Sequence, residues 1–234
     1  PIGDTNNEAA NLTTVTTVGE EASVFTYSEA RDGFDEGLIS VGPAGIPAVI
    51  FNGTDEELDT PDVAYMNFGD GVVDQGFSVG LLLNADVNNA VMSLVVKASS
   101  ATAEEWALEL DSSGQPSLVL TDESAGASIG RRDATAIGTA AWHLLVATYD
   151  GLGASVGINV YVDGVLLDDT DVNSLTYTAM EDTAGVVSIG KRYTTQERFL
   201  NGGIAFAFIT AKVLDIDDIW AVKELANSFY GLSL

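Results

Sequence analysis

The chain of 234 residues contains no cysteine and only one histidine, His143. The lack of cysteine excludes disulfides, thiolate metal sites and thiol nucleophiles. A single imidazole cannot build a multi-histidine metal site, and it leaves one candidate base for a Ser-His-Asp arrangement. The sequence also lacks a run of about 18 apolar residues, and its first residues lack the basic and apolar regions of a signal peptide. We therefore expect that the chain does not insert into a membrane and that it is made in the cytoplasm of a cell.

Positive charge is scarce as well. Nine Lys and Arg residues stand against 35 Asp and Glu residues, which gives a net charge of −26. Binding to nucleic acid needs a footprint of Lys and Arg that releases counterions, so nucleic acid and anionic membranes are excluded as expected partners. Apolar residues make up 46% of the chain, which is enough for a core, unlike disordered acidic chains. We expect a folded protein whose acidic surface suits saline water, in a marine or halophilic setting.

The sequence divides into a polar arm, residues 1–44, and a single domain, residues 45–234. The arm is rich in Thr, Gly, Glu and Asn, with two short β-branched patches that indicate an irregular pair of strands. Beyond Gly45, short apolar runs recur between turn dipeptides, a pattern typical of an all-β sandwich. We predict strands at residues 48–51, 76–83, 90–97, 105–110, 117–121, 141–149, 156–162, 185–190 and 203–211. Asn-Gly, Asp-Gly and Ser-Gly pairs, which close hairpins, stand at residues 52–53, 70–71, 113–114, 150–151, 163–164 and 201–202.

The end of the chain breaks the strand pattern. After Leu214, apolar residues recur near helical spacing, Asp217 and Asp218 stand at the start, and Gly231 stands at the end. Acidic residues suit the N-terminal turn of a helix and glycine suits its C-cap. A short C-terminal helix is predicted here.

Three strings resemble the laminin-G-like branch of the concanavalin A-like lectin and glucanase superfamily. They are VIFNGTDEELDTPDVAYMNFGDGVVDQGFSVGLLL at 49–83, WHLLVATYDG followed by INVYVDGVLL between 142 and 167, and VVSIGKR followed by FLNGGIAFAFI between 186 and 209. The resemblance covers residues 45–234 and implies a jelly-roll sandwich of two antiparallel sheets, with the C-terminal helix and the N-terminal arm added to it. Leu82 departs from the family pattern, in which a Trp is common at this position.

Relatives of this kind include glucanases, whose chemistry needs two carboxylates at the glycosidic bond. Glu105, Glu109 and Asp111 share a parity and are expected to line one face of a strand. The segment that follows Glu105, WALELDSSG, matches a laminin-G strand and not the compact Glu-x-Asp-x-x-Glu motif of related glucanases. We therefore predict a solvated strand face and no enzyme.

Some relatives bind Ca²⁺, an ion that takes oxygen ligands from loops. Asp70 and Asp74 flank a Gly-rich bend and are the first candidates for a calcium site. Two further acidic loops are weaker candidates, and none of the three has EF-hand spacing. Their members are Asp55, Glu56, Glu57 and Asp59 in one loop and Asp168, Asp169 and Asp171 in the other.

A few other residues have both a functional and a structural interpretation. His143 and Trp106 are expected to be packed or hydrogen-bonded core residues, and Trp220 to pack on the apolar side of the helix. The loop SIGRRDAT carries the pair Arg131 and Arg132, which could contact an acidic neighbour or form local salt bridges. Asn11 and Asn52 begin glycosylation acceptor sequences, which matter only in a secreted protein.

Two functions follow as hypotheses. In the first, the chain is a non-enzymatic virion component that resembles the laminin-G-like decoration or fibre proteins of tailed phages. Its arm docks on other virion proteins or on sister subunits of a homo-oligomer, because a polar arm normally frays unless something holds it. In the second, it is an extracellular or cell-surface carbohydrate-binding module with a Ca²⁺-dependent loop site.

Overall fold

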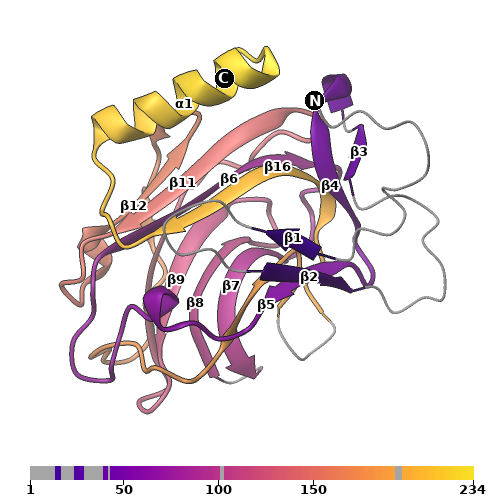
Figure 1. The fold of residues 1–234 in the computed structure, drawn as a ribbon. Coiled ribbons are helices and arrows are strands. Elements are labelled where there is room, and N and C mark those ends of the chain that lie inside the picture. Colours follow the sequence, from indigo (N-terminus) through magenta and orange to yellow (C-terminus); the bar gives the residue numbers. More distant parts are fainter. Residues whose placement is uncertain (1–13, 17–23, 29–38, 42, 101–102, 193–196) are drawn as a thin grey trace.

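The computed structural model describes residues 14–16, 24–28, 39–41, 43–100, 103–192 and 197–234 (Figure 1). Within these residues the chain forms two antiparallel sheets packed face to face and one α-helix near the C-terminus. The predicted all-β jelly-roll sandwich with a C-terminal helix is therefore confirmed. The described connections contain three short 3-10 helices: η2 (Pro43–Gly45), η3 (Ala64–Met66) and η4 (Ser155–Gly157).

One sheet has nine described strands. In spatial order they are β1 (Thr14–Thr16), β2 (Val24–Ser28), β5 (Glu57–Thr60), β15 (Val186–Ile189), β7 (Met92–Ser100), β8 (Ala103–Leu110), β9 (Pro116–Asp122), β10 (Ala127–Arg132) and β14 (Thr170–Asp171).

The other sheet has seven described strands. In spatial order they are β13 (Val165–Leu166), β12 (Ile158–Val162), β11 (Trp142–Tyr149), β6 (Phe77–Ala85), β16 (Asn201–Thr210), β4 (Pro47–Asn52) and β3 (Ile39–Val41). All nine strands predicted from the apolar runs are present, with their ends shifted by a few residues.

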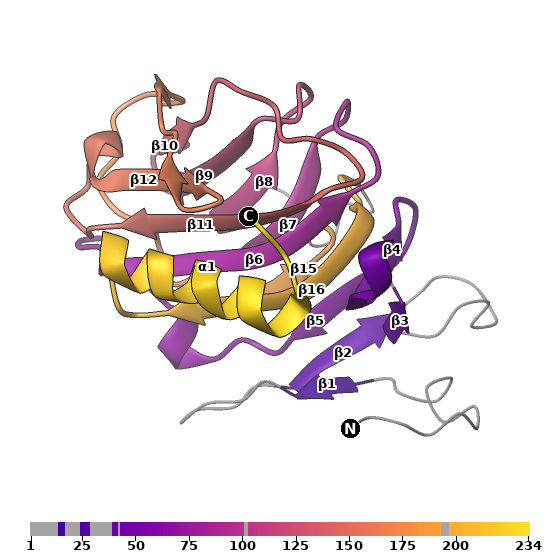
Figure 2. The same cartoon turned by 90° about the horizontal axis from the view of Figure 1, so that it is seen from above.

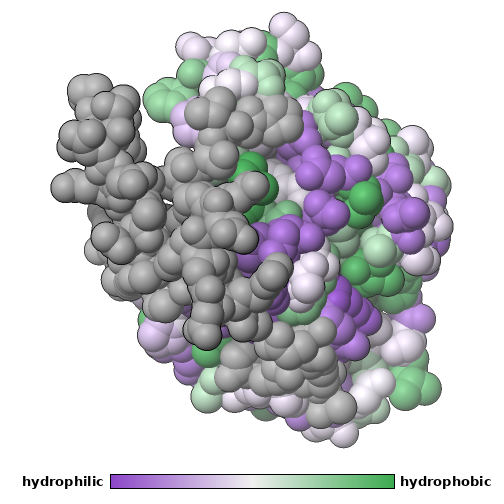
Figure 3. Space-filling model, turned by 90° about the vertical axis from the view of Figure 1, so that its right-hand side faces the viewer, coloured by the Kyte–Doolittle hydropathy of each residue, from purple (hydrophilic) through white to green (hydrophobic). Residues whose placement is uncertain are grey.

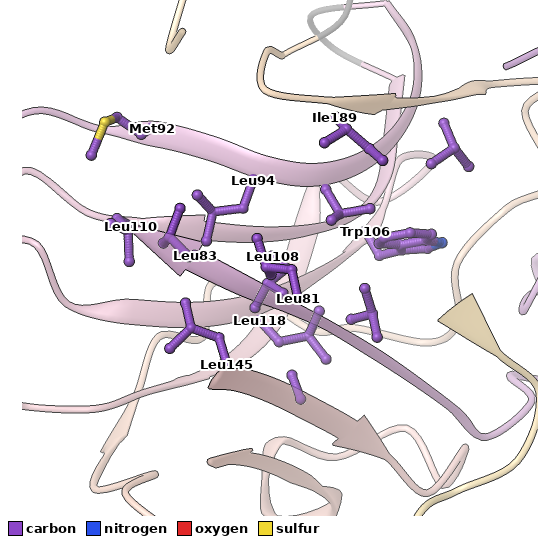
Figure 4. Close-up of a cluster of buried hydrophobic side chains, with 14 of the residues drawn as sticks. Leu81, Leu83, Met92, Leu94, Trp106, Leu108, Leu110, Leu118, Leu145 and Ile189 are labelled. Carbon is purple, nitrogen blue, oxygen red and sulfur yellow. The ribbon is translucent and has the colours of Figure 1, made fainter. Parts of the chain in front are cut away.

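The main core lies between the two sheets. Leu and aromatic side chains of both sheets meet there, and Figure 4 shows one part of this cluster. Trp106 of β8 is fully buried and lies beside Phe68 and Phe77, whose rings stack with their centroids 4.3 Å apart. Trp106 is thus a core residue, as predicted. Aromatic burial of this kind supplies much of the apolar area that stabilises a sandwich.

Strand β11 is central in its sheet and is buried on both faces. Its odd-numbered residues Leu145, Ala147 and Tyr149 belong to the core between the sheets. Its residues Trp142, Leu144 and Val146 belong to a second apolar cluster on the opposite face of the same sheet. The alternation of a strand explains this division, and the second cluster needs a cover of its own.

The helix α1 (Ile216–Tyr230) provides that cover. It lies on the seven-stranded sheet, on the side away from the other sheet (Figures 1 and 2). Asp215 is the N-cap, and a capping box joins it to Asp218 through hydrogen bonds in both directions. Gly231 ends the helix with φ +69°, a value that glycine adopts at little cost. The predicted helix and both of its end signals are confirmed.

Three strands of the N-terminal segment pair with the sheets of the same chain. β1 and β2 form the expected strand pair, and β2 continues onto β5 with Thr26 opposite Asp59. β3 pairs with β4 at the edge of the other sheet. The described strands within 1–44 therefore extend both sheets, while the division into an arm and a domain stays a prediction.

Two local predictions are wrong. SIGRRDAT is not a loop, because residues 127–132 form β10 and pair with β9 and β14. Asn201 and Gly202 do not close a hairpin, because both belong to β16 and pair with β4. In contrast, Asp163 and Gly164 both have positive φ, +53° and +77°, as a tight hairpin turn between β12 and β13 requires.

Candidate functional site

The row of carboxylates on β8 was the sequence candidate for glycosidase chemistry. The register of β7 on β8 shifts between Lys97 and Ala98, which leaves Glu105 as an extra residue of β8. The carboxylate of Glu105 contacts the Lys97 ammonium at 2.8 Å, and both side chains are buried. Burial raises the pKa of Glu105, and the hydrogen bond from Lys97 opposes this shift. The expected shared face fails at Glu105 because a bulge interrupts the alternation of the strand.

The other two carboxylates of β8 have cations of their own. Glu109 accepts from Arg198 at 2.7 Å, and burial raises its pKa. Asp111 accepts from Arg132 at 2.8 Å. The three candidate carboxylates therefore belong to three separate ion pairs and do not form one acid and base pair.

A second group of acidic residues lies where three loops meet, residues 69–76, 150–157 and 173–181. We call these three segments the loop rim. Asp74 lies at its centre and accepts hydrogen bonds from the hydroxyls of Tyr149, at 2.6 Å, and Tyr177, at 2.7 Å. Its other oxygen accepts from the backbone N–H of Met180 at 2.8 Å. Burial raises the pKa of Asp74 and of both tyrosines.

Further hydrogen bonds hold the loops of the rim together. The N–H of Gly71 donates to the carbonyl of Met180 at 2.8 Å, and the N–H of Gly153 donates to the Tyr149 hydroxyl at 2.7 Å. The Asn173 amide donates to the Ser155 hydroxyl at 3.0 Å. These hydrogen bonds fix the three loops relative to one another, so the rim is a rigid surface. Five aliphatic side chains are exposed on it: Val72, Val73, Leu152, Val156 and Leu175.

Asp70, the other predicted calcium ligand, is on the rim but holds a turn. Its Oδ1 accepts from the N–H groups of Val72 and Val73 at 2.9 and 2.8 Å. These two bonds lower the pKa of Asp70. Among the residues that the structure describes, no three His, Cys, Asp or Glu side chains form a group able to hold a metal ion. A calcium ion at Asp70 and Asp74 stays a prediction.

The two weaker acidic loops divide between turns and ion pairs. Asp55 accepts a hydrogen bond from the Asn52 amide at 2.8 Å. Asn52, which begins one of the two glycosylation acceptor sequences, therefore lies in an exposed turn. Glu57 and Asp59 are not loop residues, because they belong to β5. Asp168 and Asp171 both pair with Arg131. The other glycosylation acceptor sequence, which begins at Asn11, lies outside the residues that the structure describes.

His143 and Trp220 differ in how far they agree with the prediction. The Nδ1 atom of His143 lies 2.8 Å from Oδ2 of Asp163, so this residue is hydrogen-bonded as expected. Trp220 does not pack into the core: it is 46% exposed, and Lys223 Nζ lies 4.8 Å from its ring centroid. The reason is the phase of α1, which turns Ile219 inward and its neighbour outward.

Every basic side chain in the described part of the chain has a partner within the molecule. Seven of them form ion pairs with carboxylates, and Lys223 donates to the Asp163 carbonyl at 2.9 Å and lies over the Trp220 ring. Arg131 and Arg132 thus form local salt bridges, which was one of the two interpretations of this pair. The seven are Lys97, Arg131, Arg132, Lys191, Arg192, Arg198 and Lys212.

Comparison with known proteins agrees with this architecture. Two antiparallel sheets in a jelly roll, closed by a helix, define a lectin-like sandwich. Residues 52–219 match the laminin G family model of the concanavalin A-like lectin/glucanases superfamily. The chain belongs to this superfamily, as the sequence resemblance implied. No curated protein matches the chain in sequence.

Solved structures share the fold at low identity. The binding domain of botulinum neurotoxin serotype D/C is 13% identical, with a TM-score of 0.60 over 92% of this chain and 50% of that one. The serotype G binding domain is 12% identical, with a TM-score of 0.56 over 92% and 47%. The chain thus spans about half the length of these toxin domains. The CBM40 module of Ruminococcus gnavus IT-sialidase is 16% identical, with a TM-score of 0.51 over 64% and 83%.

Among the described residues, none of the helices reaches the length and hydropathy that a membrane span requires. Figure 3 shows one face of the molecule, and its coloured part mixes hydrophilic residues with smaller hydrophobic patches.

Proposed function

We propose that this chain is a non-enzymatic binding module that attaches to neutral glycans through its loop rim. The observation that carries the proposal is the rim itself, where a hydrogen-bonded framework leaves five aliphatic side chains exposed beside hydroxyl, amide and carboxylate groups. The apolar faces of sugar rings pack on such side chains, and a few polar groups then fix their orientation. The three separate ion pairs on β8 support the non-enzymatic part of the proposal, because they hold apart the carboxylates that were the candidates for glycosidase chemistry.

Charge selects the class of glycan. The R. gnavus CBM40 module has been solved with bound α2,3-sialyllactose, an anionic sugar. In this chain the described cations are already paired, and the net charge is −26. Sialic acid would meet repulsion here without a free cation to offset it. We therefore infer a preference for uncharged sugars.

Calcium enters this proposal as a site at Asp70 and Asp74. Both residues are on the rim, and their carboxylate oxygens are the hard ligands that the ion prefers. Asp74 is held by two tyrosine hydroxyls and one N–H, so an ion would have to compete with those bonds. Binding of neutral glycans that is lost with a chelator and in Asp70→Ala would support the calcium site.

The test is binding to an array that carries neutral and sialylated glycans. The double variant Leu152→Ser and Leu175→Ser removes two of the most exposed side chains of the rim, and we expect it to lose binding at least tenfold. Leu225→Ser on α1 is the matched control, because it is also exposed, and it is expected to bind like the parent chain. Unchanged binding in the rim variant, or a preference for sialylated sugars, would contradict the proposal.

A second candidate function comes from the N-terminal strands. β1, β2 and β3 lie along the edges of both sheets, and edge pairing is the kind of contact that can be exchanged between copies of a chain or extended by a partner strand. We infer a structural role in which residues 1–44 anchor the sandwich in a homo-oligomer or on a virion, as a capsid decoration or fibre protein of a tailed phage.

Truncation tests this second function. A chain that starts at Gly45 is expected to lose its oligomeric state by light scattering and its attachment to virions. A control with the same truncation plus residues 1–44 added as a separate peptide should recover part of the assembly. A monomeric full-length chain whose truncation leaves attachment unchanged would reject the anchoring role without affecting the glycan proposal.

A further inference from the structure

Lys97 of β7 is a buried amine held between two carboxylates. Its side chain is 0% exposed. Its Nζ atom lies 2.8 Å from Glu105 Oε1, 3.2 Å from Asp62 Oδ1 and 3.0 Å from the carbonyl of Gly185. Burying such a group of charges carries a desolvation penalty that its mutual attraction does not reliably offset. A reaction that removes these charges would also remove this desolvation penalty.

The surroundings of the amine are apolar on the sheet. Lys97 stands opposite Trp106 of β8 on one side and Val187 of β15 on the other, and both neighbours are buried. The amine is therefore closed off from bulk water on the side of the sheet. The carboxyl groups in contact with Nζ are the reaction partners available to it.

Glu105 is fixed in place for proton transfer. The N–H and the hydroxyl of Thr183 donate to its Oε1 at 3.1 and 2.9 Å. Its other oxygen, Oε2, is buried and has no hydrogen-bond partner among the described residues. Burial raises the pKa of Glu105, so it accepts a proton more readily than a solvated glutamate.

Asp62 is more exposed and less constrained than Glu105, and this difference makes it the better candidate for the carboxyl group that the amine attacks. Its side chain is 32% exposed, and it lies in the segment that follows β5, outside the sheet. The carboxyl group therefore has room to turn its carbon atom toward Nζ, and a released water can reach solvent. Glu105 is held by Thr183 in a closed site and lacks both properties.

We propose that Lys97 and Asp62 condense to an intramolecular isopeptide bond, with Glu105 as the group that carries the proton. A proton passes from the Lys97 ammonium to the Asp62 carboxylate across their contact of 3.2 Å, and the freed Nζ lone pair then attacks Cγ of Asp62. Glu105 takes a proton from nitrogen and delivers it to the leaving hydroxyl, which departs as water. One N–C bond forms and one C–O bond breaks, and the ammonium and carboxylate of the starting pair become an amide and one water. The step needs no oxidant or cofactor.

The bond would tie the segment after β5 to the centre of the nine-stranded sheet. The two residues are 35 positions apart, so the cross-link closes a loop that includes β6 and the first six residues of β7. A covalent tie of this length restricts the unfolded chain in the way a disulfide does, and this chain contains no cysteine. The proposal stands independently of the ligand of the loop rim.

The test is the intact mass of the purified folded chain, followed by peptide mapping. We expect a mass lower than the sequence mass by one water, and a proteolytic fragment that joins the peptides containing residues 62 and 97. Asp-Gly sites can also lose water by forming a succinimide, but hydroxylamine cleaves a succinimide and leaves an amide intact. A chain that keeps its full sequence mass after prolonged incubation, or a water loss that maps to another site, overturns the proposal.

Variants separate the roles of the three residues. Asp62→Ala and Lys97→Arg should keep the full mass, and Asp62→Asn should lose ammonia in place of water. Glu105→Gln should slow the reaction at least tenfold while both reacting residues remain. Lys191→Arg is the matched control, because Lys191 is a second buried lysine paired with a glutamate, Glu57, and it should still lose water. Should Glu105→Gln fail to fold by circular dichroism, the partly exposed Asp62→Ala decides: water loss that persists in that variant contradicts the proposal.

Discussion

The two sheets of the sandwich are covered in different ways. The seven-stranded sheet has an apolar outer face, with Leu82, Leu144 and Val146 packed under α1. On the nine-stranded sheet, Val96, Ala98 and Ala107 form only a small cluster apart from the main core. Around that cluster, ion pairs take the place of apolar contacts: Glu57 with Lys191, Glu104 with Arg192, and Glu109 with Arg198.

The difference shows how a chain with few cations uses them. An apolar cover stabilises by area removed from water. A paired charge stabilises little when exposed, and when buried it mainly makes the loss of its partner costly. The nine-stranded sheet should therefore be the more sensitive of the two to single substitutions at charged positions, and the seven-stranded sheet to loss of apolar volume.

The largest effect is expected from breaking the buried pair at Lys97. In the Asp62→Ala background, where the proposed isopeptide bond cannot form and the ammonium remains, Glu105→Ala removes the closest partner of Lys97, and we expect the free energy of unfolding to fall by about 3–5 kcal/mol. The double variant Lys97→Met and Glu105→Leu replaces both charges by apolar groups and should recover most of that loss. Urea unfolding followed by tryptophan fluorescence measures both. Equal stability of the single and double variants would show that the pair carries no coupling.

The next effect tests the apolar cover. Ile219 is fully buried between α1 and its sheet, and Ile219→Ala should cost roughly 2–4 kcal/mol because it leaves a cavity. Leu225→Ala on the exposed side of the same helix should stay within about 0.5 kcal/mol of the parent chain. Similar losses in both variants would mean that α1 contributes through its helicity and not through packing.

A smaller effect is expected from pH. Burial raises the pKa of Asp59, Asp74, Glu105 and Glu109. Because these folded pKa values exceed the unfolded ones, the folded state binds more protons, and stability should increase as pH falls from 7 to about 5. Each pKa unit corresponds to about 1.4 kcal/mol. Melting temperatures measured across this range should therefore rise on acidification.

Substitutions can assign the pH effect to its residues. Glu109→Gln should flatten the rise, because it removes one of the groups with a raised pKa. The pKa of Asp122 is shifted in the opposite direction. Burial would raise this pKa, but hydrogen bonds from the N–H groups of Ala125 and Thr178 outweigh the effect of burial and lower it. Its contribution is present above its ordinary pKa and is lost only at lower pH, so Asp122→Asn should leave the rise between pH 7 and about 5 in place.

The smallest effect is expected from salt. Self-repulsion of a net charge of −26 is screened as ionic strength rises, so the melting temperature should increase between low salt and about 1 M NaCl. The gain should shrink at pH 5, where fewer carboxylates are charged. A melting temperature that stays constant or falls would contradict the predicted adaptation to saline water.

Much of the fold could be predicted because local signals carried it. Apolar runs bounded by Gly-containing turns identified nine strands, and Asp217, Asp218 and Gly231 marked the helix. β10 was missed because Gly130, Arg131 and Arg132 look like a polar loop, although neighbouring strands on both sides hold them in the sheet. Edge and bulge positions depend on partners that are remote in sequence.

The candidate sites were harder to predict for the same reason. The Gly-rich bend drew attention to Asp74 as a calcium ligand, but its hydrogen-bond partners Tyr149 and Tyr177 lie 75 and 103 positions away in the sequence. Strand parity placed Glu105 with Glu109, and a register shift that no sequence pattern indicates separated them. Trp220 was misplaced because several apolar residues on α1 compete for the inward face, and packing on the sheet decides between them.

The pairing of the cations also determines how the molecule can be attached to a surface. Lys97 and Lys191 are buried. Lys212 has a side chain that is 58% exposed, the largest fraction among the three lysines that form ion pairs in the described part of the chain. It lies directly before α1 and pairs with Asp218 of that helix. Amine-reactive coupling through a lysine should therefore place the helix side of the sandwich against the support, a defined orientation obtained without an engineered tag.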